Sequence, residues 1–160
     1  MKDIYLLSKS AINLLKNKKL TLGTMESCTS GSLCSALTNI SGSSDVIRGS
    51  IVTYCTEMKI MYGVNENIIK EHTVYSNECA KEMSCCARIN TKADIGIGVT
   101  GCLGRLDPLN TGGEINKVYY NININGNSNS FKINVPNGDR QAQKEYVVVN
   151  ILENLIKLIK

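Results

Sequence analysis

The sequence predicts an α/β domain of three layers, with a mixed β-sheet and helices packed on both of its faces. Short apolar runs alternate with amphipathic helical patterns through the first two thirds of the chain, as in layered α/β domains. Two strand patterns around Asn125-Gly126 then indicate a hairpin, which adds antiparallel pairing. A length of 160 residues suits one domain, so we expect a single domain over 1–160.

The elements of the first half follow from periodicity and from helix-start signals. Apolar residues at steps of three and four predict a helix over about 3–17, and a short apolar run predicts a strand over 20–25. A helical face follows after 31, and a second strand is expected over 46–54. Thr56 is expected to cap a helix that carries Lys59 in its first turn, with Gly63 ending it.

The second half begins with a short helical turn over 65–71 and a helix that Ser76 caps. A strand over 93–100 contains two glycines, which indicates close approach by another element. A long irregular loop is expected over 105–116, and loops of that length are often functional. Strands over 117–124 and 130–135 and a helix over 140–159 complete the chain.

Composition and charge argue against several classes of function, namely nucleic-acid binding, zinc binding and association with membranes. The net charge of +4 is spread along the chain without an aromatic ladder, so we expect no nucleic-acid partner. Seven cysteines without a C-x-x-C pair, together with a single histidine, His72, argue against a zinc site. No signal peptide or long apolar run is evident. We therefore expect free thiols, a cytoplasmic location and no association with membranes.

Three polar or glycine-rich segments follow predicted strands, at 26–31, 55–59 and 100–104. Ligands of open α/β sheets gather beyond the carboxyl ends of the strands. If these three strands are parallel neighbours, the segments converge on one crevice. The sequence thus predicts a site at this edge of the sheet.

Ser27 lies on the first of these turns, ahead of a helix whose first N–H groups favour a negative charge. It is either a helix cap or a nucleophile. A nucleophilic serine needs a base, and no histidine pair is present. Lys59 is a candidate base, because a helix N-terminus and burial both lower the pKa of a lysine. A solvated surface lysine is the alternative.

Four further residues have two interpretations each. Tyr54 either donates a hydrogen bond in the site or packs in the core, and Cys28 is either a thiolate nucleophile or a buried thiol. Arg140 either binds phosphate or lies on the surface. Gly101 either presents its N–H to a ligand or serves the turn alone. His72 is expected to be structural.

An ordered set of motifs resembles the CinA C-terminal domain family, the bacterial nicotinamide mononucleotide amidohydrolases. The segment Glu26-Ser27-Cys28-Thr29-Ser30-Gly31 is similar to the family's E-S-C-T-G-G. The resemblance covers nearly the whole chain. The further segments that match, in order, are Gly42-Ser43-Ser44, Tyr54-Cys55-Thr56-Glu57-Met58-Lys59, Gly63-Val64, Glu71-His72 with Ser76, Ala93-Asp94 through Val99-Thr100-Gly101, and Gly138-Asp139-Arg140.

The resemblance implies hydrolysis of the carboxamide of nicotinamide mononucleotide, without metal or cofactor, by a Ser/Lys dyad. Ser27 matches the nucleophile and Lys59 the base, with Tyr54 beside them. The resemblance also implies a phosphorylated pyridine nucleotide as the substrate, and we expect a homo-oligomer, with a dimer as the first hypothesis. Substrate binding is expected at Thr29, Ser30, Gly31, Thr100, Gly101 and Arg140, with backbone N–H groups near Thr29 to Gly31 or at Gly101 holding the oxyanion.

Two departures from the family pattern support an alternative. Ser30 stands where the family has glycine, and the 102–116 loop is altered. The family's G-I-A-G-P is Gly101-Cys102-Leu103-Gly104-Arg105 here, and the segment from Gly113 to Tyr119 lacks the family's proline and inner glycine. The alternative is a catalytically impaired paralogue that binds pyridine nucleotides or serves a regulatory role related to competence or damage.

Overall fold

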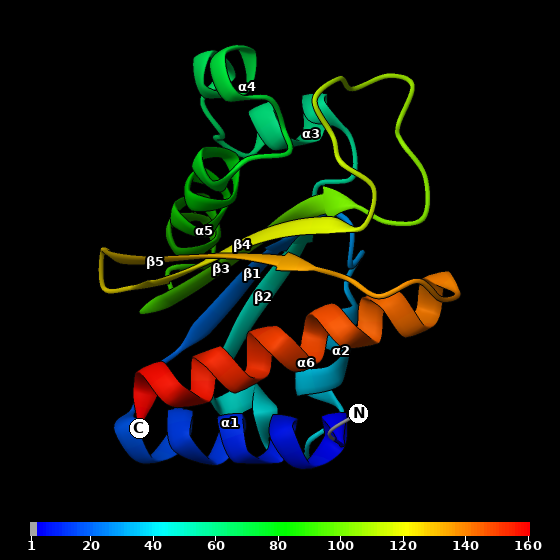
Figure 1. The fold of residues 1–160 in the computed structure, drawn as a ribbon. Coiled ribbons are helices and arrows are strands. Elements are labelled where there is room, and N and C mark those ends of the chain that lie inside the picture. Colours follow the sequence, from blue (N-terminus) through cyan, green and yellow to red (C-terminus); the bar gives the residue numbers. More distant parts are fainter. Residues whose placement is uncertain (1–2) are drawn as a thin grey trace.

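A computed structural model describes residues 3–160, and Figure 1 shows its layered arrangement. In chain order the elements are α1 (Ile4–Lys18), β1 (Leu22–Glu26), α2 (Ser32–Thr38), the 3₁₀ turn η1 (Ser43–Asp45), β2 (Ile47–Val52), α3 (Thr56–Met61), α4 (Glu66–His72), α5 (Asn77–Thr91), β3 (Ile95–Cys102), β4 (Lys117–Ile124), β5 (Asn127–Asn134) and α6 (Arg140–Ile159).

The five strands form one mixed sheet in the order β2-β1-β3-β4-β5. β1 pairs in parallel with both β2 and β3, while β3, β4 and β5 pair antiparallel. Glu26, the last residue of β1, lies between Val52 of β2 and Val99 of β3. The predicted mixed α/β sheet is confirmed, and the carboxyl ends of the three parallel strands meet at one edge.

Helices cover both faces of the sheet (Figure 1). On one face α1, α2 and α6 pack over the larger apolar core, whose fully buried members include Leu15, Leu37 and Leu152. On the other face α5 packs over a smaller core that includes Met25 and Met83. The buried residues of α5 include Cys79, Met83 and Cys86, and those of α6 include Val148, Leu152 and Leu155.

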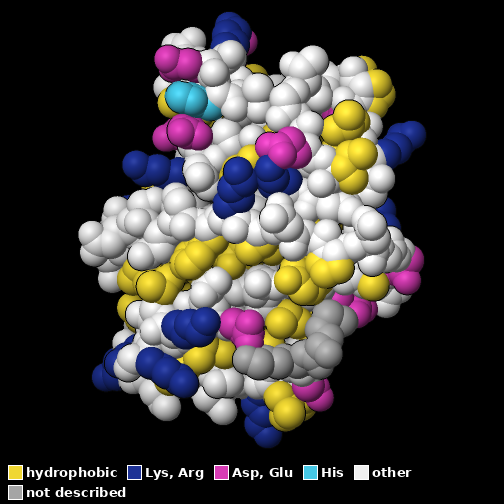
Figure 2. All heavy atoms as spheres, in the orientation of Figure 1, with side chains coloured by type: hydrophobic (Ala, Val, Ile, Leu, Met, Phe, Trp, Pro, Cys, Tyr) yellow, Lys and Arg dark blue, Asp and Glu magenta, His cyan; other side chains and the backbone are white. Residues whose placement is uncertain are grey.

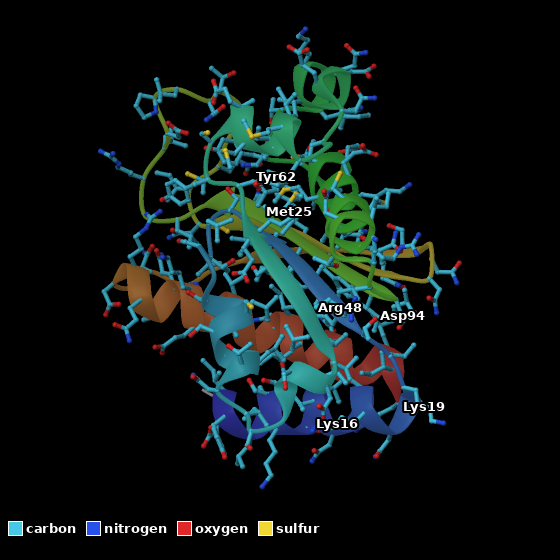
Figure 3. All side chains as sticks on the ribbon, turned by 180° about the vertical axis from the view of Figure 1, so that it is seen from behind. Lys16, Lys19, Met25, Arg48, Tyr62 and Asp94 are labelled. Atoms are coloured by element: carbon cyan, nitrogen blue, oxygen red, sulfur yellow. The ribbon has the colours of Figure 1, made fainter. Side chains whose placement is uncertain are left out.

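The view from behind shows the two ends of the sheet (Figure 3). Met25 lies at the end that α3 covers, and Tyr62 packs against its core cluster. Asp94 lies at the opposite end, where its carboxylate accepts hydrogen bonds from the N–H and hydroxyl of Thr21. These contacts join the residues that precede β1 and β3, at the amino end of the parallel strands.

The two glycines of β3 allow α5 to approach the sheet closely. A Cβ atom at Gly96 would overlap the backbone of Ser84, and one at Gly98 would overlap the backbone of Ala80. Side chains at these positions would push α5 away from the sheet. The close approach that the sequence indicated is confirmed.

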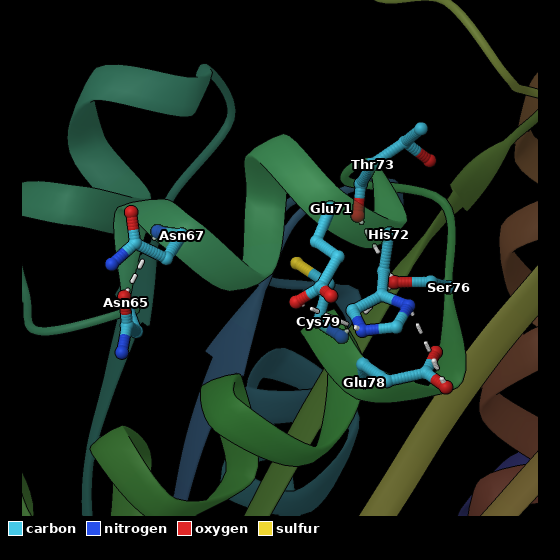
Figure 4. A network of polar contacts seen from close by, with 8 residues as sticks. All are labelled: Asn65, Asn67, Glu71, His72, Thr73, Ser76, Glu78 and Cys79. Carbon is cyan, nitrogen blue, oxygen red and sulfur yellow. Dashed lines mark hydrogen bonds and ion pairs between the residues drawn. The ribbon is translucent and has the colours of Figure 1, made fainter.

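The predicted helix cap at Ser76 is confirmed, and Asn65 caps a helix as well. Asn65 and Ser76 cap α4 and α5 by accepting hydrogen bonds from Asn67 N and Cys79 N (Figure 4). The predicted Thr56 cap is wrong, because Cys55 is the N-cap residue of α3. Thr56 is the first helical residue, and its hydroxyl donates to Asn110 Oδ1 at 2.9 Å.

The hairpin is also longer than expected. β5 begins at Asn127, not at 130, and pairs at once with Ile124 of β4. Asn125 and Gly126 both have positive φ, at 50° and 95°. Two such residues form a tight turn whose twist matches that of the paired strands, so Asn125 and Gly126 alone connect β4 to β5.

Candidate active site

The carboxyl ends of β1, β2 and β3 open on a cavity of about 360 Å³, at the edge of the sheet where the sequence predicted a crevice. The three polar segments converge there because β2, β1 and β3 are parallel neighbours. The lining residues are Ser27, Cys28, Tyr54, Cys55, Lys59, Val74, Tyr75, Thr100, Gly101, Cys102, Leu103, Arg105, Leu106, Asp107, Pro108, Leu109, Asn110 and Arg140.

A serine and a lysine meet in the wall of this cavity. Lys59 Nζ donates to Ser27 Oγ at 3.0 Å and to the carbonyl oxygen of Thr53 at 2.9 Å. Lys59 is only 2% exposed and Ser27 8% exposed. A separation of 3.0 Å is within the range of a working nucleophile–base pair. The alternatives of a solvated surface lysine and of a helix-capping Ser27 do not describe the structure, since Gly31 is the N-cap residue of α2.

The pKa of Lys59 is lowered from its ordinary value, but one of the two expected causes is incorrect. Desolvation by burial is the main cause, because it disfavours the charged ammonium. Lys59 belongs to the last turn of the six-residue helix α3, not to a first turn where the dipole would repel a cation. Burial therefore increases the fraction of Lys59 that is neutral and able to accept a proton.

The buried carboxylate of Glu26 organises the turn that carries Ser27. It accepts hydrogen bonds from the Thr29 hydroxyl at 2.7 Å and from Gly31 N at 2.9 Å. Leu33 N and Cys34 N donate to it as well, at 3.2 and 2.9 Å. Sequence reasoning assigned no role to Glu26, although a negative charge close to a helix N-terminus is favoured by the N–H groups there.

Three predicted substrate-binding residues do not reach the cavity. Thr29 is fully buried, and its hydroxyl is engaged by Glu26. Ser30 and Gly31 line a separate hollow beside α6, where Lys144 Nζ donates to Ser30 Oγ at 2.8 Å. The Gly31 N–H expected at an oxyanion is held by Glu26. The turn thus presents Ser27 on one side and residues 30–31 on the other.

The remaining predicted residues do line the cavity. Tyr54 is 59% exposed, which rules out the core alternative. Arg140 donates to the Tyr54 hydroxyl and to the Leu103 carbonyl oxygen, both at 2.9 Å. The Thr100 hydroxyl donates to the Val74 carbonyl oxygen at 2.8 Å. Arg140 therefore ties the end of β2 to the residue that follows β3.

Cys28 does not have the properties of a nucleophile. It is buried, and burial, together with the nearby charge of Glu26, raises the pKa of its thiol to about 12. A protonated thiol is a weak nucleophile. Burial similarly raises the pKa of the Cys79 thiol to about 12. The buried-thiol interpretation of Cys28 is the one that the structure supports.

The outer part of the cavity is formed by the loop after β3. The Asp107 carboxylate accepts hydrogen bonds from Asn110 Nδ2 at 2.6 Å and from the Tyr75 hydroxyl at 3.3 Å. Hydrogen bonds from Asn110 and from Leu109 N lower the pKa of Asp107. Leu109 is 90% exposed, and hydrophobic side chains show on the surface over this loop (Figure 2). The contacts of Asp107 and Tyr75 were not predicted, because their partners are distant in sequence or inside the loop.

Other polar groups lie apart from the cavity. His72 Nε2 lies 3.7 Å from Glu71 and Nδ1 lies 4.0 Å from Glu78, at the junction of α4 and α5 (Figure 4). Within residues 3–160, no group of three His, Cys, Asp or Glu side chains is arranged to hold a metal ion. In that same part of the chain, no helix is long and apolar enough to cross a membrane.

Comparison with known proteins gives concordant matches. The model of the CinA C-terminal domain matches residues 5–159. A protein of Caldicellulosiruptor bescii named for competence-damage induction is 36% identical over an alignment of 158 positions that covers 96% of this chain and 38% of that protein. A CinA-like protein of Dictyoglomus turgidum is 35% identical over 93% of this chain and 36% of its own length. The chain therefore spans less than two fifths of these relatives.

Solved structures of similar length match as well. A competence or damage-inducible protein from Enterobacter asburiae is 26% identical, with a TM-score of 0.93 and full coverage of both chains. A competence/damage inducible protein from Agrobacterium tumefaciens is 28% identical, with a TM-score of 0.91 over 100% of this chain and 98% of that one. With the family model covering nearly all of it, the chain belongs to the CinA C-terminal domain family.

Proposed function

We propose that this protein is an amidohydrolase that converts nicotinamide mononucleotide to nicotinate mononucleotide and ammonia. The observation that carries the proposal is the buried pair of Ser27 Oγ and Lys59 Nζ, 3.0 Å apart in the wall of a cavity. The identity of the substrate is inferred from the resemblance to the family's amidohydrolases. The motif residues of that resemblance, Ser27, Tyr54, Lys59 and Arg140, line one cavity.

In the proposed reaction, Ser27 Oγ attacks the carboxamide carbon while neutral Lys59 takes the serine proton. The Thr53 carbonyl accepts one N–H of the amine, which leaves the nitrogen lone pair for Ser27. The C–N bond then breaks, and Lys59 passes the proton to departing ammonia. Water hydrolyses the resulting acyl-serine ester to the carboxylate and restores the Ser27 hydroxyl.

The oxyanion of this reaction requires free N–H donors near Ser27. Three N–H groups near the nucleophile are occupied, since Ser27 N donates to the Val99 carbonyl, Ser30 N to the Ser27 carbonyl and Gly31 N to Glu26. Within residues 3–160, no backbone hydrogen bond is found for the N–H groups of Cys28 and Thr29, and the Cys28 N–H lies beside its own thiol. These two groups, next to the nucleophile, are our candidates for the oxyanion hole.

Two arginines suit the phosphate of the proposed substrate. Arg140 and Arg105 both line the cavity, and both have exposed side chains. A guanidinium can bind phosphate through two parallel hydrogen bonds. Arg140 also holds the Tyr54 hydroxyl, so substrate bound to it would be placed beside Tyr54.

The experiment is an ammonia-release assay on nicotinamide mononucleotide with the wild type, Ser27→Ala and Lys59→Met. We expect wild-type turnover, a loss of roughly 10⁴-fold or more in Ser27→Ala, and a loss of about 10²–10⁴-fold in Lys59→Met. Full activity in Ser27→Ala would refute the proposed nucleophile. Thermal stabilisation of the wild type by this nucleotide without ammonia release would favour the alternative of a pyridine-nucleotide-binding paralogue.

A further inference from the structure

We propose that Glu26 is a positioning residue for the nucleophile: its carboxylate sets the conformation of the turn that presents Ser27 Oγ to Lys59. This inference rests on the proposed function only in assigning Ser27 as the nucleophile. Glu26 does not line the cavity and would not touch the substrate. Its effect on the reaction therefore passes through Ser27.

The carboxylate is fully buried and has an unusual set of partners. Five donors converge on it, three of them backbone N–H groups and two of them hydroxyls. Its Oε1 accepts from Thr24 Oγ1 at 3.2 Å and Cys34 N at 2.9 Å. Its Oε2 accepts from Thr29 Oγ1, Gly31 N and Leu33 N at 2.7, 2.9 and 3.2 Å. No lysine or arginine pairs with it within residues 3–160, so these dipoles alone stabilise the buried charge.

The donors determine the path of the chain on both sides of Ser27. Glu26 precedes the serine, and its side chain reaches forward to residues 29 to 34, so the turn folds around the carboxylate. Ser30 and Gly31 within this turn have positive φ, at 48° and 91°. Positive φ is unfavourable for a serine, so contacts elsewhere in the turn must stabilise this conformation. Glu26 engages the N–H groups of Gly31, Leu33 and Cys34 and makes no hydrogen bond to those of Cys28 and Thr29.

The main chain of Glu26 links this turn to the base. Its carbonyl oxygen accepts from Thr53 N at 2.9 Å, and the carbonyl oxygen of Thr53 accepts from Lys59 Nζ at 2.9 Å. The positions of both the nucleophile and the base therefore depend on hydrogen bonds that lead back to Glu26, at the end of β1. A shift of about 1 Å between such partners is enough to lower the rate of a reaction about 10²-fold.

The test replaces the carboxylate by the isosteric amide in Glu26→Gln. The amide NH₂ would face N–H donors, so the turn loses part of its support. The reactivity of Ser27 is measured as its rate of labelling by a fluorophosphonate, a serine-directed probe that needs no pyridine nucleotide. The labelled residue is identified by mass spectrometry, with Ser27→Ala as the blank. For the folded variant we expect labelling and kcat to fall at least about tenfold, with KM within about threefold of the wild type.

Two further variants separate positioning from general loss of stability. Thr38→Val removes an exposed hydroxyl of α2 that does not contact Glu26, so labelling should stay within about twofold of the wild type. Thr29→Val removes the 2.7 Å contact on the turn side and should slow labelling severalfold, which tests the inference if Glu26→Gln does not fold. Circular dichroism establishes that each variant is folded at the assay temperature.

The outcomes distinguish this inference from the proposed function. Wild-type rates of labelling and turnover in folded Glu26→Gln would overturn the role of Glu26 and leave the amidohydrolase proposal intact. Labelling that depends on Glu26, without ammonia release by the wild type, would support the positioning role and contradict the proposed substrate. A wild type that is neither labelled at Ser27 nor active would contradict both.

Discussion

Residues of the turn at 26–34 and of the loop at 103–116 line the same cavity, but different contacts hold the two segments in place. The turn surrounds the buried carboxylate of Glu26, whose partners are mostly backbone N–H groups. The loop depends on Asp107, which lies near the surface and is held by the side chains of Asn110 and Tyr75. Hydrogen bonds to a buried charge are stronger than those at the surface.

We infer from this difference that the turn positions the proposed nucleophile and that the loop contributes to substrate binding. The segment with the buried contacts carries the proposed nucleophile, which needs a fixed position. The segment with surface contacts contributes exposed apolar side chains, Leu106 at 53% and Leu109 at 90%. Loops on rigid scaffolds commonly determine specificity. We therefore expect changes in the turn to affect stability and kcat, and changes in the loop to affect KM.

The largest expected effect is that of pH on kcat/KM, through the protonation state of Lys59. The ammonium form of Lys59 cannot accept the proton of Ser27, so kcat/KM should rise up to about tenfold per pH unit as the amine deprotonates. This rise should occur below the ordinary lysine value of 10.5, because burial lowers the pKa of Lys59. Asp107, whose pKa is also lowered, stays ionised throughout. A pH–rate profile of kcat/KM that falls as pH rises toward this pKa would contradict the assignment.

The second effect is on stability, through Thr29→Val in the turn. The hydroxyl of Thr29 donates to buried Glu26 at 2.7 Å, and a hydrogen bond to a charged group contributes about 1.5–3 kcal/mol. We expect the free energy of unfolding to fall by about 2 kcal/mol in urea denaturation. Thr38→Val is the matched control, since Thr38 is exposed on α2 and bonds only to Cys34 O and Ser35 O. Equal losses in the two variants would show that burial of Glu26 is unimportant.

A third prediction concerns the loop, through Asp107→Asn. The amide weakens the contacts to Asn110 and Tyr75, so the loop should be less ordered when substrate binds. We expect KM to rise about threefold to tenfold, with kcat nearly unchanged and stability altered by less than about 0.5 kcal/mol. Asp45→Asn, which changes an exposed partner of Lys16 outside the cavity, should leave KM unaltered. A fall in kcat at constant KM would instead place Asp107 in the chemistry.

The smallest effect is expected at Ser30, where the family has glycine. Ser30→Gly relieves an unfavourable φ of 48°, worth about 1–2 kcal/mol, but removes the hydrogen bond from Lys144, worth about 0.5–1.5 kcal/mol. The net change in unfolding free energy should lie within about 1 kcal/mol, with activity retained. Lys144→Met removes the hydrogen bond without relieving the strain, so it should be the less stable variant. A large loss in Ser30→Gly alone would show that the serine has a role of its own.

Much of the fold was predictable because local patterns and tertiary packing agree. The helix at 140–159 has an apolar stripe, an Asp139 cap and no internal breaker, and the structure has it at Arg140–Ile159. The glycines of β3 indicated close packing, and α5 occupies that space. Where prediction failed, a nonlocal contact competed with a local rule, as at Thr56, whose hydroxyl bonds to Asn110 and leaves the cap to Cys55.

The sequence by itself determined the types of groups at the site and their order along the chain. Ser27, Lys59, Tyr54 and Arg140 were identified from motifs, and parallel strands were expected to bring the motifs together. Only the tertiary structure decided which side of the turn faces the cavity. The carboxylate of Glu26 takes up the Thr29 hydroxyl and the Gly31 N–H, so the turn directs Ser27 inward and residues 30–31 away. Burial of Lys59, which lowers its pKa, likewise depends on residues distant in sequence.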